Sequence, residues 1–273
     1  MTIIQAILLG MVQGLTEFLP ISSSAHLVLV PFLFNWKLDE QEAFVFNVLV
    51  QLGTLVAVII YFRKDLLAII KAFFQGIAHH QPFQDYDSRT AWMIILATIP
   101  AGLIGLFFKD QVESAFSNPV LVALMLMITA LLMVLAEHFG KKTRKSEELN
   151  FKDALIMGLF QAVAVLPGIS RSGSTISGGL LRQLDRKTAA RFSFLMSVPI
   201  MAAAGLLAAL DLFQLPSLVS FLPVMIIGFI VSAVVGYFAI AWLMRFLTKQ
   251  PMAYFSIYLF LLSVIVLIVQ YVR

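Results

Sequence analysis

The feature that most constrains this chain is a set of apolar stretches that contain no charged residue. Six of them are long enough, or nearly so, to cross a lipid bilayer, which takes about 20 mostly apolar residues. They cover residues 43–62, 92–108, 119–136, 192–210, 217–244 and 252–272. Only 12% of all residues are charged, whereas soluble domains carry about 25%. The sequence therefore predicts an all-α polytopic membrane protein with six transmembrane helices.

Two further apolar segments are interrupted by polar breaks. Residues 1–35 carry one charge, Glu17, which is followed by a Pro-Ile-Ser-Ser-Ser break. Residues 154–181 carry one charge, Arg171, which lies inside a Pro-Gly-Ile-Ser-Arg-Ser break. Each break leaves two halves that are too short to span. Since irregular backbone at membrane depth is tolerated only where it lines a protein cavity, we expect two re-entrant helical hairpins.

The two hairpins resemble one another at an offset of 148 residues. At this offset Gly10 matches Gly158, and Gln13 matches Gln161. Three further identities fall at the breaks: Ile21 with Ile169, Ser22 with Ser170, and Ser24 with Ser172. Apolar repeats match by chance, but chance contributes least at these polar positions. The pattern indicates an internal repeat.

Each hairpin is followed by three predicted spans, so the single membrane domain of residues 1–273 divides into two repeats. We place the first at residues 1–138 and the second at residues 150–273. Because three is an odd number of crossings, the second repeat must be inverted relative to the first.

Basic residues separate onto the two faces that this topology creates. One face holds the connections 63–91, 139–153, 182–191 and 245–251. Its fifteen basic residues are Arg63, Lys64, Lys71, Arg89, Lys141, Lys142, Arg144, Lys145, Lys152, Arg182, Arg186, Lys187, Arg191, Arg245 and Lys249. The other face holds Lys37, Lys109 and Arg273. The excess predicts that the first face is cytoplasmic and that both termini lie outside. If residues 1–35 formed one full span, the topology would shift, and the distribution of basic residues would no longer agree with the inverted repeat.

Glu17 and Arg171 are the two ionisable residues at membrane depth, where a charge is costly and usually functional. Inverted repeats with broken helices place their binding sites where the breaks meet, near the midplane. We therefore expect Glu17 and Arg171 to lie close together. They belong either to such a site or to a structural ion pair that ties the hairpins.

Hydroxyl groups surround both charges. They belong to Ser22, Ser23 and Ser24 in the first break and to Ser170, Ser172, Ser174 and Thr175, around Gly173, in the second. A helix that restarts after each break presents free N–H groups and a positive dipole end, which suit phosphate. Arg171 adds a forked donor for phosphate oxygens. A helix cap needs only one hydroxyl, so the excess favours an anion-binding site.

Two spacings in the first hairpin point to catalysis. His26 follows Ser23 by three residues and shares its helix face. It is either the base for a hydroxyl nucleophile or an inert, hydrogen-bonded histidine. Gln13 and Glu17 are four residues apart and also share a face. A carboxylate and an amide oxygen suit Mg²⁺ or Ca²⁺, so these two are the candidate metal ligands.

At these residues the chain resembles the bacterial undecaprenyl pyrophosphate phosphatases linked to bacitracin resistance. The family motif Glu/Gln-x-x-x-Glu corresponds to residues 13–17, which run into Phe-Leu-Pro-Ile-Ser-Ser-Ser-Ala-His at residues 18–26. The motif Pro-Gly-x-Ser-Arg-Ser-x-x-Thr corresponds to residues 167–175. Length, span pattern and repeat fit the family over the whole chain.

The resemblance implies hydrolysis of undecaprenyl pyrophosphate to undecaprenyl phosphate, the lipid carrier reused in peptidoglycan synthesis. It also implies a divalent cation, a bacterial inner-membrane location and a site that opens to the periplasmic side. When the family's roles are carried over by position, Glu17 would bind the metal or assist the attacking group. Ser23 would be the nucleophile, and His26 its base or the acid for the leaving group. The residues that would hold the phosphates are Ser22, Ser170, Arg171, Ser172, Gly173 and Thr175.

One departure from the family pattern is Gln13, because many members have glutamate at this position. Glutamine can ligate a metal but cannot act as a base, so Glu17 is the better candidate for a charged role. The nucleophile (Ser23, His26 or metal-bound water), the metal, the preferred prenyl length and the oligomeric state, a homodimer included, stay open. The alternative function is a lipid transporter or flippase, because inverted repeats with re-entrant hairpins are also transporter architecture.

Overall fold

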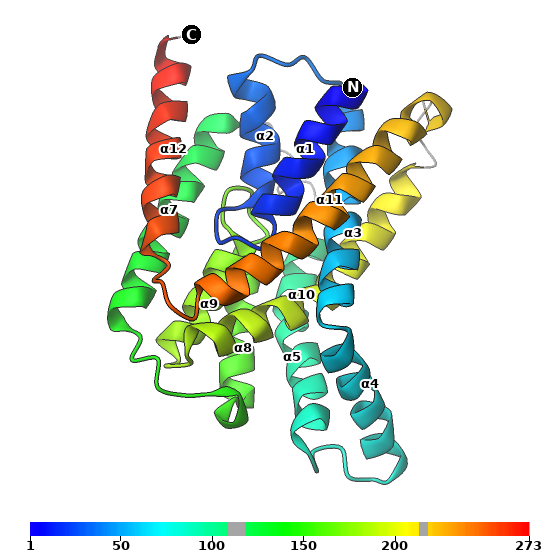
Figure 1. Cartoon of the computed structure of the whole chain (residues 1–273), viewed down its shortest axis with the longest axis vertical. Helices are drawn as coiled ribbons and strands as arrows, with labels where there is room; N and C mark the ends of the chain where they lie inside the picture. The colour runs from blue at the N-terminus through cyan, green and yellow to red at the C-terminus, as the bar shows by residue number, and fades with distance from the viewer. Residues whose placement is uncertain (109–117, 213–217, 273) are drawn as a thin grey trace.

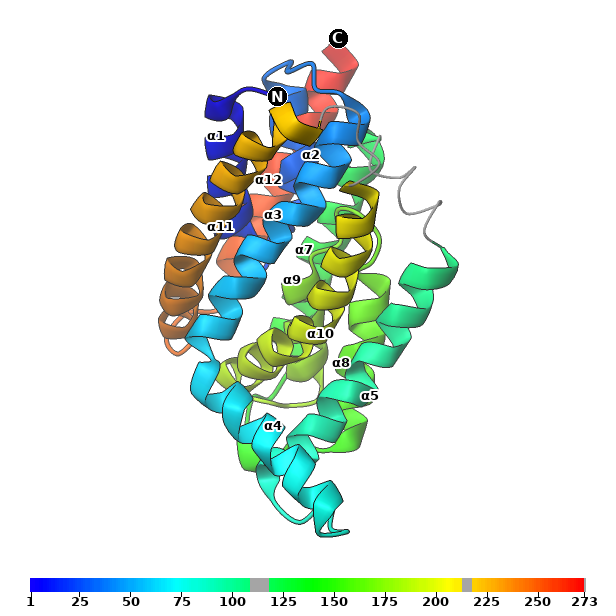
Figure 2. The same ribbon diagram turned by 90° about the vertical axis from the view of Figure 1, so that its right-hand side faces the viewer.

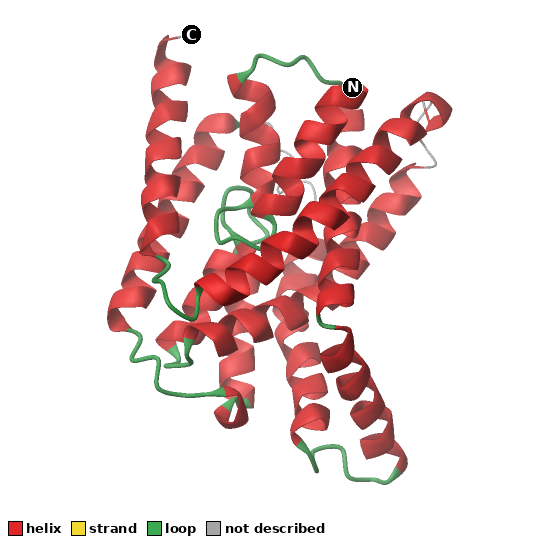
Figure 3. Cartoon of the chain, in the orientation of Figure 1, coloured by secondary structure: helices red, strands yellow, loops and turns green. Residues whose placement is uncertain are grey.

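The computed structural model describes residues 1–108, 118–212 and 218–272, and in these ranges the named elements are all helices, joined by loops (Figures 1 and 3). Lys109 and Arg273, two of the three basic residues expected on the outer face, lie outside the described residues. The first half contains α1 (Ile3–Thr16), α2 (Ser23–Leu33), α3 (Glu40–Tyr61), α4 (Arg63–Ala78), α5 (Tyr86–Phe107) and α7 (Pro119–Phe139). The second contains the short η1 (Ser146–Glu148), α8 (Phe151–Val163), α9 (Arg171–Leu181), α10 (Arg186–Leu212), α11 (Leu218–Phe246) and α12 (Ala253–Val272).

Five of the described helices are long and apolar enough to cross a membrane: α5, α7, α10, α11 and α12. A sixth span is counted if α3 and α4 are taken together, although they bend by 80° at their junction. Large apolar side chains are exposed on these helices, for example Ile257 and Phe260 on α12. Such surfaces are normal where the surrounding solvent is lipid. The prediction of an all-helical, multi-pass membrane protein is confirmed.

The segment 63–91, which the charge argument treated as a loop, is mostly helical. Helix α4 occupies residues 63–78 and packs on α5. Its apolar residues Leu66, Ile69 and Phe73 recur at helical spacing and contact the core. Arg63, Lys64 and Lys71 interrupt the apolar pattern of this helix, so uncharged runs alone do not predict it.

The two broken hairpins enter the molecule from opposite ends. In Figure 1, α1 descends from the upper end to the middle and α2 returns, whereas α8 ascends from the lower end and α9 returns. Helix α8 begins at Phe151 and α9 at Arg171, each 148 residues after the starts of α1 at Ile3 and α2 at Ser23. Both chain termini lie at the upper end in two perpendicular views (Figures 1 and 2). The breaks therefore meet inside the helical bundle.

The first helix of each hairpin packs on a helix from the other half of the chain. Helix α1 packs on α11, and α8 packs on α5. A Cβ at Gly10 would lie 2.8 Å from the carbonyl oxygen of Gly228, and one at Gly158 would lie 2.6 Å from that of Ala97. Gly10 and Gly158 are the pair matched by the repeat, and both are needed for close approach of two helix backbones. The packing is thus reciprocal between the halves.

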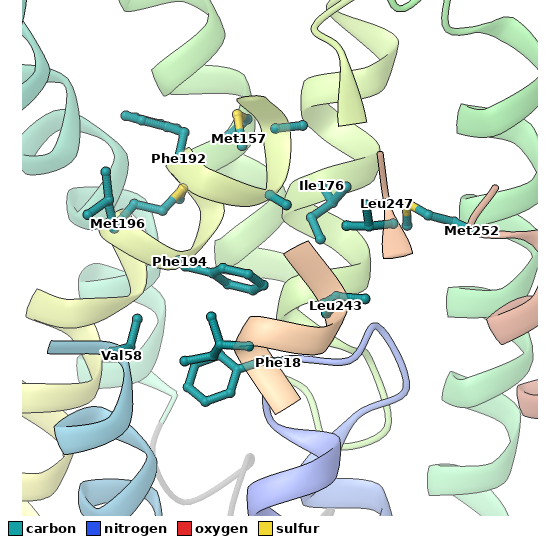
Figure 4. Packing of buried hydrophobic residues seen from close by; sticks show 14 of the residues in the cluster. Phe18, Val58, Met157, Ile176, Phe192, Phe194, Met196, Leu243, Leu247 and Met252 are labelled. Carbon is teal, nitrogen blue, oxygen red and sulfur yellow. The ribbon is translucent and has the colours of Figure 1, made fainter. Parts of the chain in front are cut away.

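Phe18 anchors the first break in the hydrophobic core. Its side chain is fully buried and meets the ring of Phe194, on α10, edge to face at 5.4 Å between centroids (Figure 4). Phe194 in turn contacts Phe62 at the bend between α3 and α4. Because Phe18 directly follows Glu17, this packing fixes the backbone that carries the carboxylate.

Candidate active site

A new helix begins at each break, as the sequence predicted. Ser22 is the N-cap of α2, and its hydroxyl accepts a hydrogen bond from the Ala25 N–H at 3.4 Å. Ser170 is the N-cap of α9, and its hydroxyl accepts from the Gly173 N–H at 3.1 Å. The matched serines therefore have the same local role. Both helices direct their N-terminal, positive ends toward the breaks.

The second break can form because Gly168 has a φ of +94°, in the left-handed region that favours glycine. A Cβ at this position would also lie 2.5 Å from the carbonyl oxygen of Val122 on α7. The Pro-Gly sequence therefore has a structural reason. It lets the chain turn tightly against α7 and then begin α9 at Arg171.

Glu17 and Arg171 form an ion pair across the two hairpins, as expected. Arg171 Nη2 donates to Glu17 Oε1 at 2.5 Å. The other carboxylate oxygen, Oε2, accepts from the Ser23 hydroxyl and from Gln13 Nε2, the latter at 2.8 Å. Both charged side chains are largely buried, with 4% of Glu17 and 17% of Arg171 exposed. The second guanidinium nitrogen, Arg171 Nη1, is buried and has no hydrogen-bond partner among the described residues.

A cavity of about 210 Å³ lies where the breaks meet. It is lined by Glu17, Ser22, Ser23, Ser24, Gln51, Ala101, Gln161, Ala164, Val165, Ile169, Ser170, Arg171, Ile200, Met201 and Ala204. The breaks and two glutamines supply its polar wall, while α5 and α10 supply apolar residues. The structure thus brings together six of the residues named from the sequence, which are Glu17, Ser22, Ser23, Ser24, Ser170 and Arg171.

His26 does not hydrogen-bond Ser23 in this structure, and its contacts match the second alternative, a hydrogen-bonded histidine. His26 Nδ1 lies 2.8 Å from the Ser22 carbonyl oxygen, and Nε2 lies 2.7 Å from the Tyr258 hydroxyl. Because a carbonyl oxygen only accepts, Nδ1 carries a proton, and in the neutral imidazole Nε2 then accepts from Tyr258. The ring also stacks on Tyr258 of α12. The group that hydrogen-bonds the Ser23 hydroxyl is Glu17.

Three residues of the second motif support the break and do not line the cavity. The Ser172 hydroxyl donates to the Leu19 carbonyl oxygen at 3.0 Å and so ties the second hairpin to the first. The Thr175 hydroxyl donates to the Arg171 carbonyl oxygen at 2.7 Å. Gly173 donates its backbone N–H to the cap serine. These contacts hold the first turn of α9 and, with it, Arg171.

Gln51 and Gln161 line the cavity but were not selected as site residues from the sequence. Gln51 lies on α3, and Gln161 lies on α8. Gln161 was noticed only as the repeat partner of Gln13. The sequence signal that both share is an amide inside an otherwise apolar helix, since a polar group in lipid requires a partner, but this signal does not identify the partner.

The site offers oxygen donors for a hard cation. Glu17 is the carboxylate in the cavity wall, and the adjacent Gln13 has a buried Oε1 without a hydrogen-bond partner in the described part of the chain. No cluster of three or more His, Cys, Asp or Glu side chains occurs within that part. Mg²⁺ is commonly held by one or two carboxylates together with substrate phosphates. Gln13 and Glu17 therefore fit a cation that completes its shell with phosphate and water.

An ion cluster at the other end of the second hairpin fixes its two helices. Asp153, in the first turn of α8, accepts from Arg144 Nη2 at 2.7 Å and from Arg182 Nε at 2.8 Å. Burial raises the pKa of the Asp153 carboxyl, but hydrogen bonds from Arg144, Arg182 and the Asn150 backbone, together with the charge of Arg144, outweigh it, so the pKa lies below its ordinary value. Because Arg182 ends α9, the cluster joins the start of α8 to the end of α9.

The fold and the site together define a multi-pass helical membrane protein in which two broken hairpins enclose a buried ion pair. The chain belongs to the family described as Bacitracin resistance protein BacA, which it matches over residues 6–265. It is 45% identical to an undecaprenyl-diphosphatase of Corynebacterium striatum over 269 residues, which are 98% of this chain and 94% of the relative. It is 42% identical to an undecaprenyl-diphosphatase of Moorella thermoacetica over 273 residues, the whole of both chains. It is also 40% identical to an undecaprenyl-diphosphatase of Myxococcus xanthus over 268 residues, 98% of this chain and 89% of the relative.

Proposed function

We propose that this protein hydrolyses undecaprenyl pyrophosphate to undecaprenyl phosphate and inorganic phosphate and so recycles the lipid carrier of peptidoglycan synthesis. The observation that carries the proposal is the pairing of a hydroxyl with a carboxylate beside a buried arginine that has a free donor. The relatives named undecaprenyl-diphosphatase support the substrate. The cavity also suits an amphiphile, since one wall is polar and the wall from α5 and α10 is apolar.

The phosphates bind between the two helix starts. Arg171 Nη1 donates to a phosphate oxygen, and charge-assisted hydrogen bonds of this kind are among the strongest in proteins. The free N–H groups at the starts of α2 and α9 add donors and a favourable dipole. Arg171 Nη2 stays on Glu17 and orients the carboxylate toward Ser23. One guanidinium thus connects the substrate with the catalytic carboxylate.

Ser23 is the nucleophile in this proposal, and Glu17 is its base. The Ser23 oxygen forms a bond to the terminal phosphorus, and its proton passes to Glu17. The bond from that phosphorus to the bridging oxygen breaks, and undecaprenyl phosphate leaves with the electron pair and takes the proton from Glu17. Water then attacks the phosphoserine. Glu17 accepts a proton from this water and returns it to the Ser23 oxygen as the phosphorus–serine bond breaks.

Gln13 and Glu17 hold the divalent cation, Mg²⁺ or Ca²⁺, in this proposal. The cation would neutralise negative charge that spreads over the phosphate oxygens in the transition state. The donor set supports this assignment, because the Gln13 amide already contacts the Glu17 carboxylate through Nε2 and leaves Oε1 free. The same Gln13 Nε2 also donates to the Thr54 hydroxyl on α3 at 3.3 Å, which further fixes the amide.

The proposed topology has six crossings by α3, α5, α7, α10, α11 and α12, with α1–α2 and α8–α9 as re-entrant hairpins. The repeats are residues 1–138 and 150–273, in opposite orientations, which the reciprocal packing of α1 and α8 supports. The basic connections face the cytoplasm, and the termini and the cavity face the periplasm of a bacterial inner membrane. Exposed Lys37 and Lys141 lie in connections on opposite faces of this topology.

Cysteine labelling tests the orientation without background, because the chain contains no cysteine. In intact cells, Lys37→Cys should react with a membrane-impermeant maleimide, whereas Lys141→Cys should react only after lysis. The reverse pattern would overturn the periplasmic assignment.

The catalytic proposal is tested by phosphate release from undecaprenyl pyrophosphate in detergent. The wild-type protein should release phosphate, EDTA should stop the release, and added Mg²⁺ or Ca²⁺ should restore it. Arg171→Ala should slow release by on the order of 10²- to 10³-fold, as loss of a transition-state donor does. The matched control is Arg245→Ala, since Arg245 is an exposed residue on α11. If folded wild-type protein supplied with metal released no phosphate, the proposed phosphatase activity would be refuted, and a lipid transporter would be favoured.

A further inference from the structure

Gln161 differs from its repeat partner Gln13 in what its amide contacts. Gln13 lies beside a carboxylate and donates to it. At the position in the second hairpin that matches Glu17, the chain has Val165, so Gln161 lacks this partner. Gln161 and Val165 both line the cavity. The second hairpin therefore keeps the amide but not the acid.

The free atom of the Gln161 amide is its oxygen. Nε2 lies 3.4 Å from the Ala97 carbonyl oxygen on α5. Because a carbonyl oxygen only accepts, the nitrogen must face Ala97, and Oε1 is the remaining end. This oxygen is buried and has no partner among the described residues, and the side chain as a whole is 2% exposed. A buried acceptor without a donor is unfavourable, so a ligand that donates is expected here.

Water is the donor that fits this position. Phosphate oxygens at neutral pH are mainly acceptors, so they would not satisfy an amide oxygen. A cation would need a carboxylate, and the hairpin that carries Gln161 has Val165 at the matching position. The cavity of about 210 Å³ has room for water beside Ser23, which lines the same space. Hydrolysis of a phosphoserine at Ser23 requires such a water.

We infer that Gln161 is a positioning residue that holds the attacking water for the second step of the reaction, the hydrolysis of phosphoserine at Ser23. The inference rests on the proposed covalent route. Oε1 accepts a hydrogen bond from the water and thereby fixes its orientation toward phosphorus. Glu17 takes the other proton. Formation of the phosphoserine needs no water, so only the second step depends on Gln161.

The two steps can be separated with substrate labelled at the terminal phosphorus. Excess Gln161→Leu protein in detergent with Mg²⁺ should form undecaprenyl phosphate at nearly the wild-type rate in a single turnover. Release of labelled phosphate should be slower by on the order of 10²-fold, the effect of a misplaced reactant. Label should therefore accumulate on Ser23, to be located by peptide mass spectrometry. The first step also reports that the variant is folded.

Two further variants serve as controls for the loss of the acceptor oxygen at position 161. Gln161→Glu keeps an acceptor oxygen at similar reach, so it should not accumulate label. Gln75→Leu, at an exposed position on α4, should behave as wild type.

Equal slowing of both steps in Gln161→Leu would mean a structural role and would overturn the inference. Unchanged release of phosphate, or a raised requirement for Mg²⁺, would overturn it as well. These outcomes leave the phosphatase proposal intact. Full activity of Ser23→Ala would refute the covalent route, and with it the role inferred for Gln161. Absence of hydrolysis by the wild-type protein would instead refute the proposed function.

Discussion

The ion pair between Glu17 and Arg171 allows stability to be separated from catalysis. Both side chains are largely buried, so removal of one partner leaves a charge without compensation. Such a loss typically destabilises by 3–5 kcal/mol, whereas replacement of both partners by neutral residues is often close to neutral. Since 17% of the Arg171 side chain is exposed, we expect about 3 kcal/mol for Glu17→Gln.

The double variant Glu17→Gln/Arg171→Met should recover most of that stability, to within about 1 kcal/mol of wild type. It should stay inactive, because it lacks both the base and the phosphate donor. The assay is unfolding in mixed detergent micelles followed by tryptophan fluorescence, with phosphate release measured on the same samples. A double variant no more stable than Glu17→Gln, or one that regains activity, would refute the reasoning.

Three other predictions follow from single positions. Gln13→Ala should reduce phosphate release less than Glu17→Ala, because Gln13 supplies one neutral ligand, and equal losses would contradict this. Gly158→Ala should lower the unfolding midpoint through a Cβ 2.6 Å from a backbone oxygen, whereas Gly102→Ala, with nothing within 4 Å, should not. Because the folded-state pKa of Asp153 is lowered, its contribution to stability is present above its unfolded pKa of about 3.9 and is lost as the pH falls through the folded value. The unfolding midpoint of Asp153→Asn should therefore depend less on acid pH than that of wild type.

The hairpins and their central pair could be predicted because their signal is local and repeated. Serines interrupt apolar helices at matching positions, and a charge at or beside each break requires a partner inside the protein. The offset of 148 residues then predicted that Ser22 and Ser170 have equivalent positions, and both cap a helix. Local sequence patterns, their repetition along the chain and the rule that a charge at membrane depth has a partner are sufficient for these predictions.

The partner of His26 could not be predicted in this way. Spacing places His26 and Ser23 on one helix face, but Tyr258 is 232 residues away in the sequence and reaches the imidazole only through the packing of α12. The cavity glutamines were missed for a related reason. Gln51 lies in a predicted span, and the sequence does not reveal whether such an amide faces lipid, another helix or a cavity.

The most direct test of the account is the rate of phosphate release by Ser23→Ala. We expect a loss of more than about 10³-fold, since removal of a nucleophile removes the catalysis that depends on it. The matched control is Ser263→Ala, because Ser263 is a buried helical serine whose hydroxyl donates to the Leu259 carbonyl oxygen. Near-normal release by Ser23→Ala, with Ser263→Ala unchanged, would contradict the assignment of the reacting hydroxyl to the paired breaks.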